Sequence, residues 1–225
     1  MKRTETADTH GSTRRAIVLL AVAGAMLAIA FVPWSGARAD QAEVSALVDT
    51  LAREFATVMY DERLDPPQRI ARLESVFEDA FDVDRISRMV LAANETQPTA
   101  AQMTEFRKLF SRYVAVISAA WLSSLSERPL VVTGHRQHSD EQSFVTAEIR
   151  RPAPDQPLRL GFRIRKTPDG LRIYDVLVEG ISLVLTKRDE IRSLVQREGI
   201  DRMLARLREV TQVADRRVSA RAAAR

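Results

Sequence analysis

Apolar residues recur every three or four positions through the first half of the chain, and this spacing predicts helices. One stripe runs from Val44 to Met59, and a second follows the capping-box sequence from Asp65 to Gln68. A short helix is predicted after Asp82, and the longest helix after another capping box at Thr99 to Gln102. The inward face of that longest helix is predicted to hold Met103, Phe106, Phe110, Tyr113, Val114, Ile117, Trp121 and Leu125.

The pattern changes to alternation in the second half, which predicts strands. The clearest case is Leu158 to Arg165, where every second residue is apolar and three of the four between them are Arg. Further strands are predicted at residues 130–133, 143–150 and 171–178. Short connections, including a turn at Pro168 to Gly170 in which the glycine takes a positive φ, predict an antiparallel meander.

Helical spacing resumes directly after Glu179-Gly180, where the last strand stops. Ser182 is predicted to cap a helix that ends before Gly199, and one more helix is predicted to end near residue 214. The tail from Asp215 to Arg225 has no apolar stripe and is predicted to be disordered.

These elements together predict one α+β domain over residues 40–214. Helices are expected over 40–127, a sheet of about four strands over 129–180, and helices again over 182–214. A chain of this length is sufficient for a single hydrophobic core.

Residues 1–39 have the pattern of an export signal. Basic residues precede an uninterrupted apolar run of 17 residues, Ala16 to Val32, and a small-residue cleavage site follows at Ala37 to Ala39. We therefore expect cleavage after Ala39, while Arg14-Arg15 leaves the choice between the general and the twin-arginine export route open. An uncleaved anchor is the alternative, although a spanning helix needs about 20 apolar residues.

Charge and cysteine content restrict the function classes. The whole chain carries a net charge of +4, but residues 40–214 carry −2, because both ends of the chain are basic. Nucleic-acid binding requires clustered basic charge on the folded body, so we predict no nucleic-acid partner. The absence of cysteine excludes disulfides, thiolate catalysis and a lipid-modified cysteine anchor.

Two groups of residues are candidates for a metal or nucleophile site. His135 and His138 lie near Asp140 and Glu141, but two histidines in a polar segment are more often solvated than zinc ligands. Ser182 lies outside the G-x-S-x-G pattern of hydrolases, and helix capping is its simpler role. We predict no metal ligand and no catalytic residue.

Tyr174 and Asp175 form the one pair that resembles an acid–base site. Neighbouring residues of a strand point to opposite faces of a sheet, so the two side chains are not expected to share one cavity. An enzyme that uses Tyr174 or Asp175 remains an alternative. The apolar residues of sheet and helices are equally compatible with a filled core, that is, with a purely structural protein.

Several motifs follow one another in the order found in the MlaC family, also called the toluene-tolerance family, and the chain resembles that family over residues 44–210. The strongest is Tyr174-Asp175-Val176 followed by Glu179-Gly180-Ile181-Ser182. Phe81-Asp82 before a short helix, the Thr99 to Gln102 cap, and Gly199 before a Leu-rich helix are similar as well. The chain departs from the family after the short helix and at Leu171, since both places usually hold Trp.

The resemblance implies a periplasmic carrier of phospholipid, and no enzyme. The expected fold is a curved antiparallel sheet wrapped by helices, like the nuclear transport factor 2 roll, with a helical subdomain. Acyl chains would lie between sheet and helices, with the bound phospholipid as cargo and no cofactor. The predicted lipid-binding wall consists of Phe110, Tyr113, Val114, Ile117, Leu160, Phe162, Ile164, Tyr174, Val176 and Val178.

The partners implied by the resemblance are two membrane assemblies: an inner-membrane ABC transporter with a periplasmic lipid-binding subunit, and an outer-membrane lipoprotein complex. A hopanoid or sterol-like carrier of the same fold is the first alternative, since a related branch of the family is associated with hopanoid traffic. Arg159, Arg163 and Arg165 form a polar stripe that would meet either an acidic partner or solvent.

Overall fold

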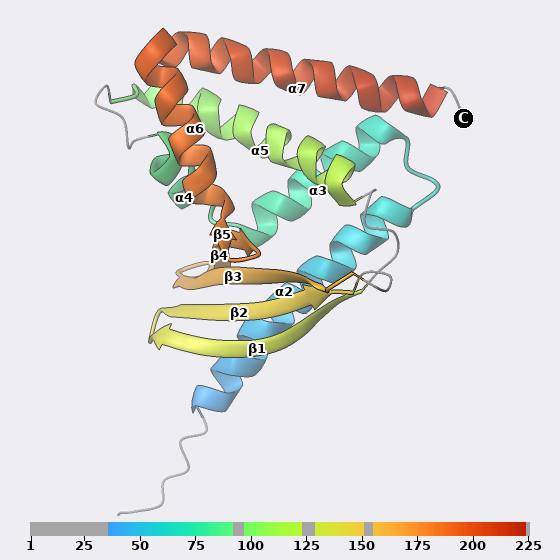
Figure 1. Ribbon diagram of the computed structural model, residues 1–225, viewed down its shortest axis with the longest axis vertical. Coiled ribbons are helices and arrows are strands. Elements are labelled where there is room, and N and C mark those ends of the chain that lie inside the picture. Colours follow the sequence, from blue (N-terminus) through green and yellow to red (C-terminus); the bar gives the residue numbers. More distant parts are fainter. Residues whose placement is uncertain (1–35, 92–96, 123–128, 151–154, 224–225) are drawn as a thin grey trace, which may run out of the picture. The chain divides into compact units, whose positions relative to one another are not determined.

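The computed structural model describes residues 36–91, 97–122, 129–150 and 155–223, and the chain from Asp40 onwards forms one compact unit. Helices and strands are arranged as an α+β fold, which confirms the predicted class (Figure 1). The helices are α2 (Gly36–Tyr60), α3 (Pro66–Ala80), α4 (Val83–Leu91), α5 (Ala100–Leu122), α6 (Leu183–Glu198) and α7 (Ile200–Ala223). The strands are β1 (Leu130–Ser139), β2 (Gln142–Ile149), β3 (Leu158–Thr167), β4 (Gly170–Val178) and β5 (Ile181–Ser182).

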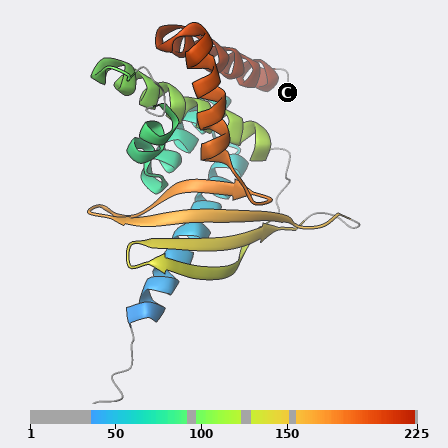
Figure 2. The same cartoon turned by 60° about the vertical axis from the view of Figure 1, so that its left-hand side comes forward.

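The strands form an antiparallel meander in the order β1-β2-β3-β4-β5 (Figure 2). The sheet has five strands where about four were expected, because the chain makes a short hairpin to β5 before α6 begins. Gly170 adopts φ +106° in the turn between β3 and β4, as its place after Pro168-Asp169 predicted. The antiparallel meander predicted from the alternation is therefore confirmed.

Helix α2 crosses one face of the sheet in both views (Figures 1 and 2). The alternation of β2 and β3 places an apolar row on that face, and burying it against the stripe of α2 removes both from water. The buried members of this cluster include Val44, Val48, Leu51 and Val58 of α2 and Val145, Ala147, Ile149, Leu160, Phe162 and Ile164 of the sheet.

A second apolar cluster holds the helical subdomain together. Its buried side chains come from α4, α5, α6 and α7 and from Phe77 of α3, and α5 packs against both α3 and α7. The fully buried Phe106 stacks on Phe110, with 5.3 Å between ring centroids. The two clusters lie on either side of α5, since Ala115, Val116 and Ala119 of the same helix belong to the first. Helix α5 therefore contributes side chains to both clusters.

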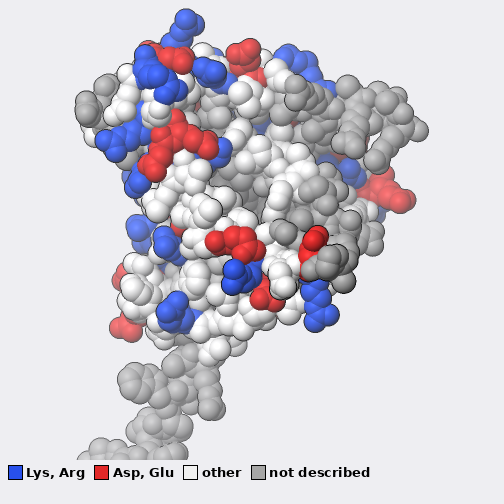
Figure 3. Space-filling model, in the orientation of Figure 1, with Lys and Arg blue, Asp and Glu red and all other residues white. Residues whose placement is uncertain are grey.

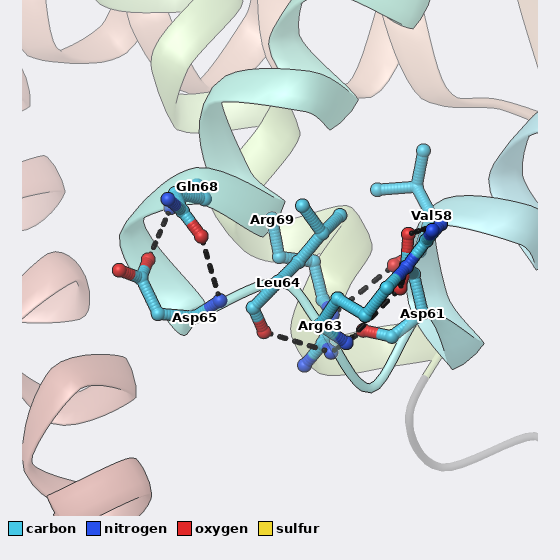
Figure 4. Close-up of polar contacts among 7 residues, drawn as sticks. All are labelled: Val58, Asp61, Arg63, Leu64, Asp65, Gln68 and Arg69. Atoms are coloured by element: carbon cyan, nitrogen blue, oxygen red, sulfur yellow. Dashed lines mark hydrogen bonds and ion pairs between the residues drawn. The ribbon is translucent and has the colours of Figure 1, made fainter.

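Helix α3 begins at the capping box that its sequence predicted (Figure 4). The Asp65 carboxylate accepts from the backbone N–H of Gln68 at 2.7 Å, and the Gln68 side chain accepts from the N–H of Asp65 at 3.0 Å. Pro66 occupies the first helical position, where its missing N–H costs nothing. These contacts satisfy donors that the first turn of a helix leaves free.

The connection from α2 to α3 is held by the guanidinium of Arg69 (Figure 4). It donates to the carbonyl oxygens of Val58, Asp61 and Leu64 at 3.1, 2.7 and 3.3 Å. Arg63 folds back on Asp61, and its hydrogen bonds lower the pKa of that carboxyl group to about 2. Arg69 therefore ties the C-terminal end of α2 to the loop that leads into α3.

Other helix ends also follow the sequence signals. Thr99 and Gln102 form a second capping box, and the Ser182 hydroxyl accepts from the N–H of Leu185 at 3.0 Å. Gly199 ends α6 with φ +83°. Each of these predicted caps is confirmed.

Helix α7 is longer than predicted. It continues to Ala223, so the expectation of a disordered tail from residue 215 is wrong for residues 215–223. Asp215 lies in this extension and pairs with Arg112 of α5 at 3.1 Å, while Arg112 also contacts Glu74. Alanine and arginine have high helix propensity, so a helix can form here although the sequence has no apolar stripe. The ion pair adds a tertiary contact that the hydrophobic pattern did not reveal.

The predicted export signal lies almost entirely outside the described residues, which begin at Gly36. Helix α2 includes Ala37 to Ala39, where cleavage is predicted. Within the part of the chain that is described, every helix is too short or too polar to cross a membrane.

Candidate functional site

A cavity of about 780 Å³ lies between the sheet and the helices. Its wall is formed by α2, α5, strands β1 to β4 and the beginning of α6, with Phe77 of α3 and Ile86 of α4, and most of the lining side chains are apolar. Ligand pockets usually measure about 300–1,000 Å³, and this cavity lies within that range. The apolar residues of sheet and helices therefore enclose a hollow between them instead of filling the core completely.

Eight of the ten residues predicted for the wall lie in it, whereas Ile164 and Tyr174 do not. Those eight are Phe110, Tyr113, Val114, Ile117, Leu160, Phe162, Val176 and Val178. Ile164 is fully buried in the core formed with α2, away from the hollow. Whether these eight residues contact a lipid stays a prediction.

An irregularity in the pairing of β3 with β4 explains the position of Tyr174. Arg163 pairs with Asp175 and Ile164 with Ile173, so Tyr174 has no cross-strand partner. A β-bulge of this kind shifts the alternation by one residue. The Tyr174 hydroxyl donates to Gln142 at 3.1 Å, and the guanidinium of Arg85 lies 4.9 Å from its ring centroid, both outside the cavity.

Asp175 is the buried charged residue of the cavity wall, with a relative exposure of 1%. Its carboxylate accepts hydrogen bonds from the Ser182 hydroxyl at 2.7 Å, the Val184 N–H at 3.2 Å and Arg163 at 3.2 Å. These donors compensate the charge and tie β4 to the first turn of α6. The cavity holds Asp175 without Tyr174, so the pair considered as an acid–base site is separated.

Comparison with known proteins adds to this geometry. The family model described as MlaC protein matches residues 46–209, which is most of the chain. The chain belongs to the MlaC family. The resemblance predicted from the ordered motifs is thereby confirmed.

A solved structure of a phospholipid-binding protein from Ralstonia solanacearum, in complex with a phospholipid, has the same fold. The match has a TM-score of 0.64 at 16% sequence identity, and it covers 75% of this chain and 97% of that one. At this identity the match shows that the two proteins share a fold, that is, the same arrangement of sheet and helices.

Helix α2 supplies a wall that the sequence analysis missed. Nine of its residues line the cavity: Val48, Asp49, Leu51, Ala52, Arg53, Phe55, Ala56, Met59 and Tyr60. Helical spacing marked α2 as an ordinary packing helix, since a helix that covers a hollow has the same stripe as one that fills a core. The sequence signal that could have indicated a cavity wall is the pair of small side chains, Ala52 and Ala56, which lie one turn apart beside Phe55 and Tyr60.

The mouth of the cavity is marked by apolar side chains that line it and also face solvent. Tyr60, Ile117, Trp121 and Leu183 are each between 39% and 45% exposed. Exposed apolar residues that also line a cavity are typical of sites that meet an apolar ligand or partner. In this member of the MlaC family the mouth is therefore bordered by the ends of α2 and α5 and the start of α6.

Lys187 is the basic residue of α6 in the wall. Its ammonium lies 2.7 Å from the Glu190 carboxylate and 5.4 Å from the ring centroid of Tyr113. Burial alone lowers the pKa of Lys187, but the hydrogen bonds that its ammonium donates to Glu190 and Tyr113 outweigh burial and raise the pKa above its usual value. The residue is therefore charged throughout the physiological range.

The arginine stripe of β3 is occupied by carboxylates of the same chain. Arg159 pairs with Glu179 at 3.2 Å, Arg163 with Asp175, and Arg165 with Asp82 at 2.8 Å. On the face shown in Figure 3, basic and acidic side chains are interspersed and form no single basic patch. The stripe thus ties the inner strand β3 to β4, to the turn after β4 and to Asp82 directly before α4, in addition to facing solvent.

A second depression, of about 560 Å³, lies beside Phe81. Nine charged side chains line it, and among them Arg165 pairs with Asp82 and Arg107 with Asp84. Such a lining does not suit an apolar ligand. His135 and His138 lie in β1, and within the described residues no group of three potential metal ligands surrounds them.

Proposed function

We propose that this protein binds phospholipid by enclosing the acyl chains in the cavity between sheet and helices. The observation that carries the proposal is the apolar hollow of about 780 Å³ in a chain that belongs to the MlaC family. The structural neighbour from Ralstonia solanacearum, which is described as bound to a phospholipid, supports it.

Burial of the chains accounts for retention. Each methylene removed from water contributes about 0.8 kcal/mol, so one long acyl chain contributes on the order of 10 kcal/mol. Spontaneous escape into water is correspondingly slow. Release then requires an acceptor that meets the mouth and offers the chains another apolar environment, with no covalent step and no titrating residue.

We propose further that the protein is periplasmic and shuttles phospholipid between membrane assemblies. The export pattern of residues 1–39, with cleavage after Ala39, supports export. The partners would be an inner-membrane ABC transporter with a periplasmic lipid-binding subunit and an outer-membrane lipoprotein complex, which together maintain lipid asymmetry of the outer membrane. The exposed apolar residues at the mouth are where such partners are expected to dock.

The test is native mass spectrometry of the mature protein purified from the periplasm, with lipid extraction of the same sample. A bound species with the mass of a phospholipid is the expected result. A bound species with the mass of a hopanoid would show that the ligand is the alternative one and not phospholipid. A bare protein that also takes up no lipid from detergent-solubilised phospholipid would overturn the proposal.

A further inference from the structure

Two side chains of opposite charge, Lys187 and Glu190, lie one helical turn apart where α6 leaves the cavity. We propose that this pair is a head-group site that favours zwitterionic phospholipids: Lys187 binds the phosphate, and Glu190 binds the terminal ammonium group. The inference rests on the proposed function and adds a choice of ligand to it.

Lys187 has the position and the donors for a phosphate. It lines the apolar wall, and 29% of its side chain remains accessible to solvent. A lysine ammonium has three donors, and its contacts among the described residues are with Glu190 and Tyr113. One donor therefore remains for a phosphate oxygen, and the aliphatic stem of the lysine continues the apolar wall.

The order of groups along α6 matches the order of groups along a phospholipid. Val184 is buried in the cavity wall with 7% exposure, Lys187 lies in the wall one turn later with 29% of its side chain exposed, and Glu190 lies one turn further, outside the lining and with 56% exposed. A diacyl lipid presents chains, then glycerol and phosphate, and last the ammonium group. With the chains enclosed, the phosphate comes to lie near Lys187 and the ammonium group near Glu190.

The other charges of the wall do not favour an anionic head group. Arg53 is balanced in number by Asp49, while Asp175 is paired with Arg163 and Lys187 with Glu190. The site therefore offers a lipid no excess of positive charge. A zwitterion can satisfy both Lys187 and Glu190, whereas a lipid with a net negative charge meets the Glu190 carboxylate without compensation.

The competing explanation is an ordinary surface ion pair. Pairs at this spacing stabilise a helix by about 0.3–0.5 kcal/mol and require no ligand. In that case removal of either charge would leave the choice of lipid unchanged. Head-group selectivity, measured separately from the total amount of lipid bound, distinguishes the two explanations.

The experiment uses delipidated protein and mixed detergent micelles that contain equal amounts of phosphatidylethanolamine and phosphatidylglycerol with identical acyl chains. Bound lipid is extracted and its head groups are quantified by mass spectrometry. The wild type is expected to bind phosphatidylethanolamine in roughly threefold excess or more, as one partly exposed charge contact allows. Glu190→Gln is expected to abolish the excess, and Glu190→Lys to invert it with the total unchanged.

Two neighbours on α6 provide matched controls. Asp189→Asn and Arg192→Gln change charge at exposed positions outside the cavity wall and should keep the wild-type ratio. Lys187→Gln should lower the binding of both lipids, since it removes the phosphate contact that they share. Equal binding by the wild type, or a ratio that Glu190→Lys leaves unchanged, would overturn the head-group site while leaving the carrier function intact. Failure of the wild type to bind either lipid would overturn both.

Discussion

At the scale of single residues, the turn after β4 explains the most distinctive motif of the chain. Val178 pairs with Ile181, so Glu179 and Gly180 are the central residues of a two-residue hairpin. Both have positive φ, +48° and +83°, as a type I′ turn requires. Glu179 tolerates this conformation while its carboxylate accepts from the backbone N–H of Arg159 at 2.8 Å.

The first prediction concerns Gly180. A Cβ at this position would meet nothing within 4 Å, so any loss of stability comes from the backbone conformation alone. Gly180→Val should reduce the free energy of unfolding by about 1–2 kcal/mol, whereas Gly180→Asn should cost less because asparagine tolerates positive φ. Denaturant unfolding measures both, and equal effects of the two variants would contradict the turn argument.

The second prediction concerns the buried carboxylate of Asp175. Replacing it by an amide keeps the shape but places an N–H₂ group or a single acceptor among three donors, from Arg163, Ser182 and Val184. Asp175→Asn should therefore reduce the free energy of unfolding by about 2 kcal/mol.

The exposed turn residue Asp169 is the control for this substitution, and Asp169→Asn should leave stability unchanged within error. Thermal and denaturant unfolding of both variants test the expectation. If Asp175→Asn were as stable as the wild type, the carboxylate would not be what ties β4 to α6.

At the scale of elements, helices and strands were predictable wherever residues carry a local signal. Capping residues such as Asp65 and Ser182 bind their own helix, so their effect can be read from neighbouring sequence. The bulge at Tyr174 could not be predicted, because it depends on how β4 pairs with β3. The wall formed by α2 could not be predicted either, since apolar stripes do not distinguish a filled core from a hollow one.

The third prediction belongs to α2 as a wall of the cavity. Ala56 lines the hollow, while its neighbour Thr57 is exposed and lies outside the lining. Ala56→Trp should fill part of the cavity and weaken lipid binding roughly tenfold, because overpacking a site costs about 1–3 kcal/mol. Thr57→Trp adds the same side chain one position away and should bind lipid as the wild type does.

Lipid bound per protein, after exposure to solubilised phospholipid, measures both variants. The two variants should have similar thermal unfolding temperatures, because both positions are exposed to solvent in the protein without lipid. Equal lipid binding by Ala56→Trp and Thr57→Trp would show that the ligand does not lie against α2.

At the scale of the whole domain, the cavity lies where two apolar clusters meet. One cluster joins α2 to the sheet and the other joins α4, α6 and α7, while α3 and α5 contribute side chains to both. The wall draws Phe162 and Val176 from the sheet side and Ile86 and Phe110 from the helical side. A ligand in the hollow therefore contacts both clusters and supplies packing that neither makes with the other.

The fourth prediction follows from this arrangement. A ligand that binds only the folded protein stabilises it by about 2.7 kcal/mol at a hundredfold excess over Kd. For a domain of this size each kcal/mol raises the Tm by about 2–4 °C, so phospholipid should raise the Tm by roughly 5–10 °C over delipidated protein. A lysophospholipid, which has one chain, buries less apolar surface and should raise the Tm less. Differential scanning calorimetry of the three samples tests this expectation. If lipid-free and lipid-loaded protein unfolded at the same temperature, the ligand would not bridge the two clusters.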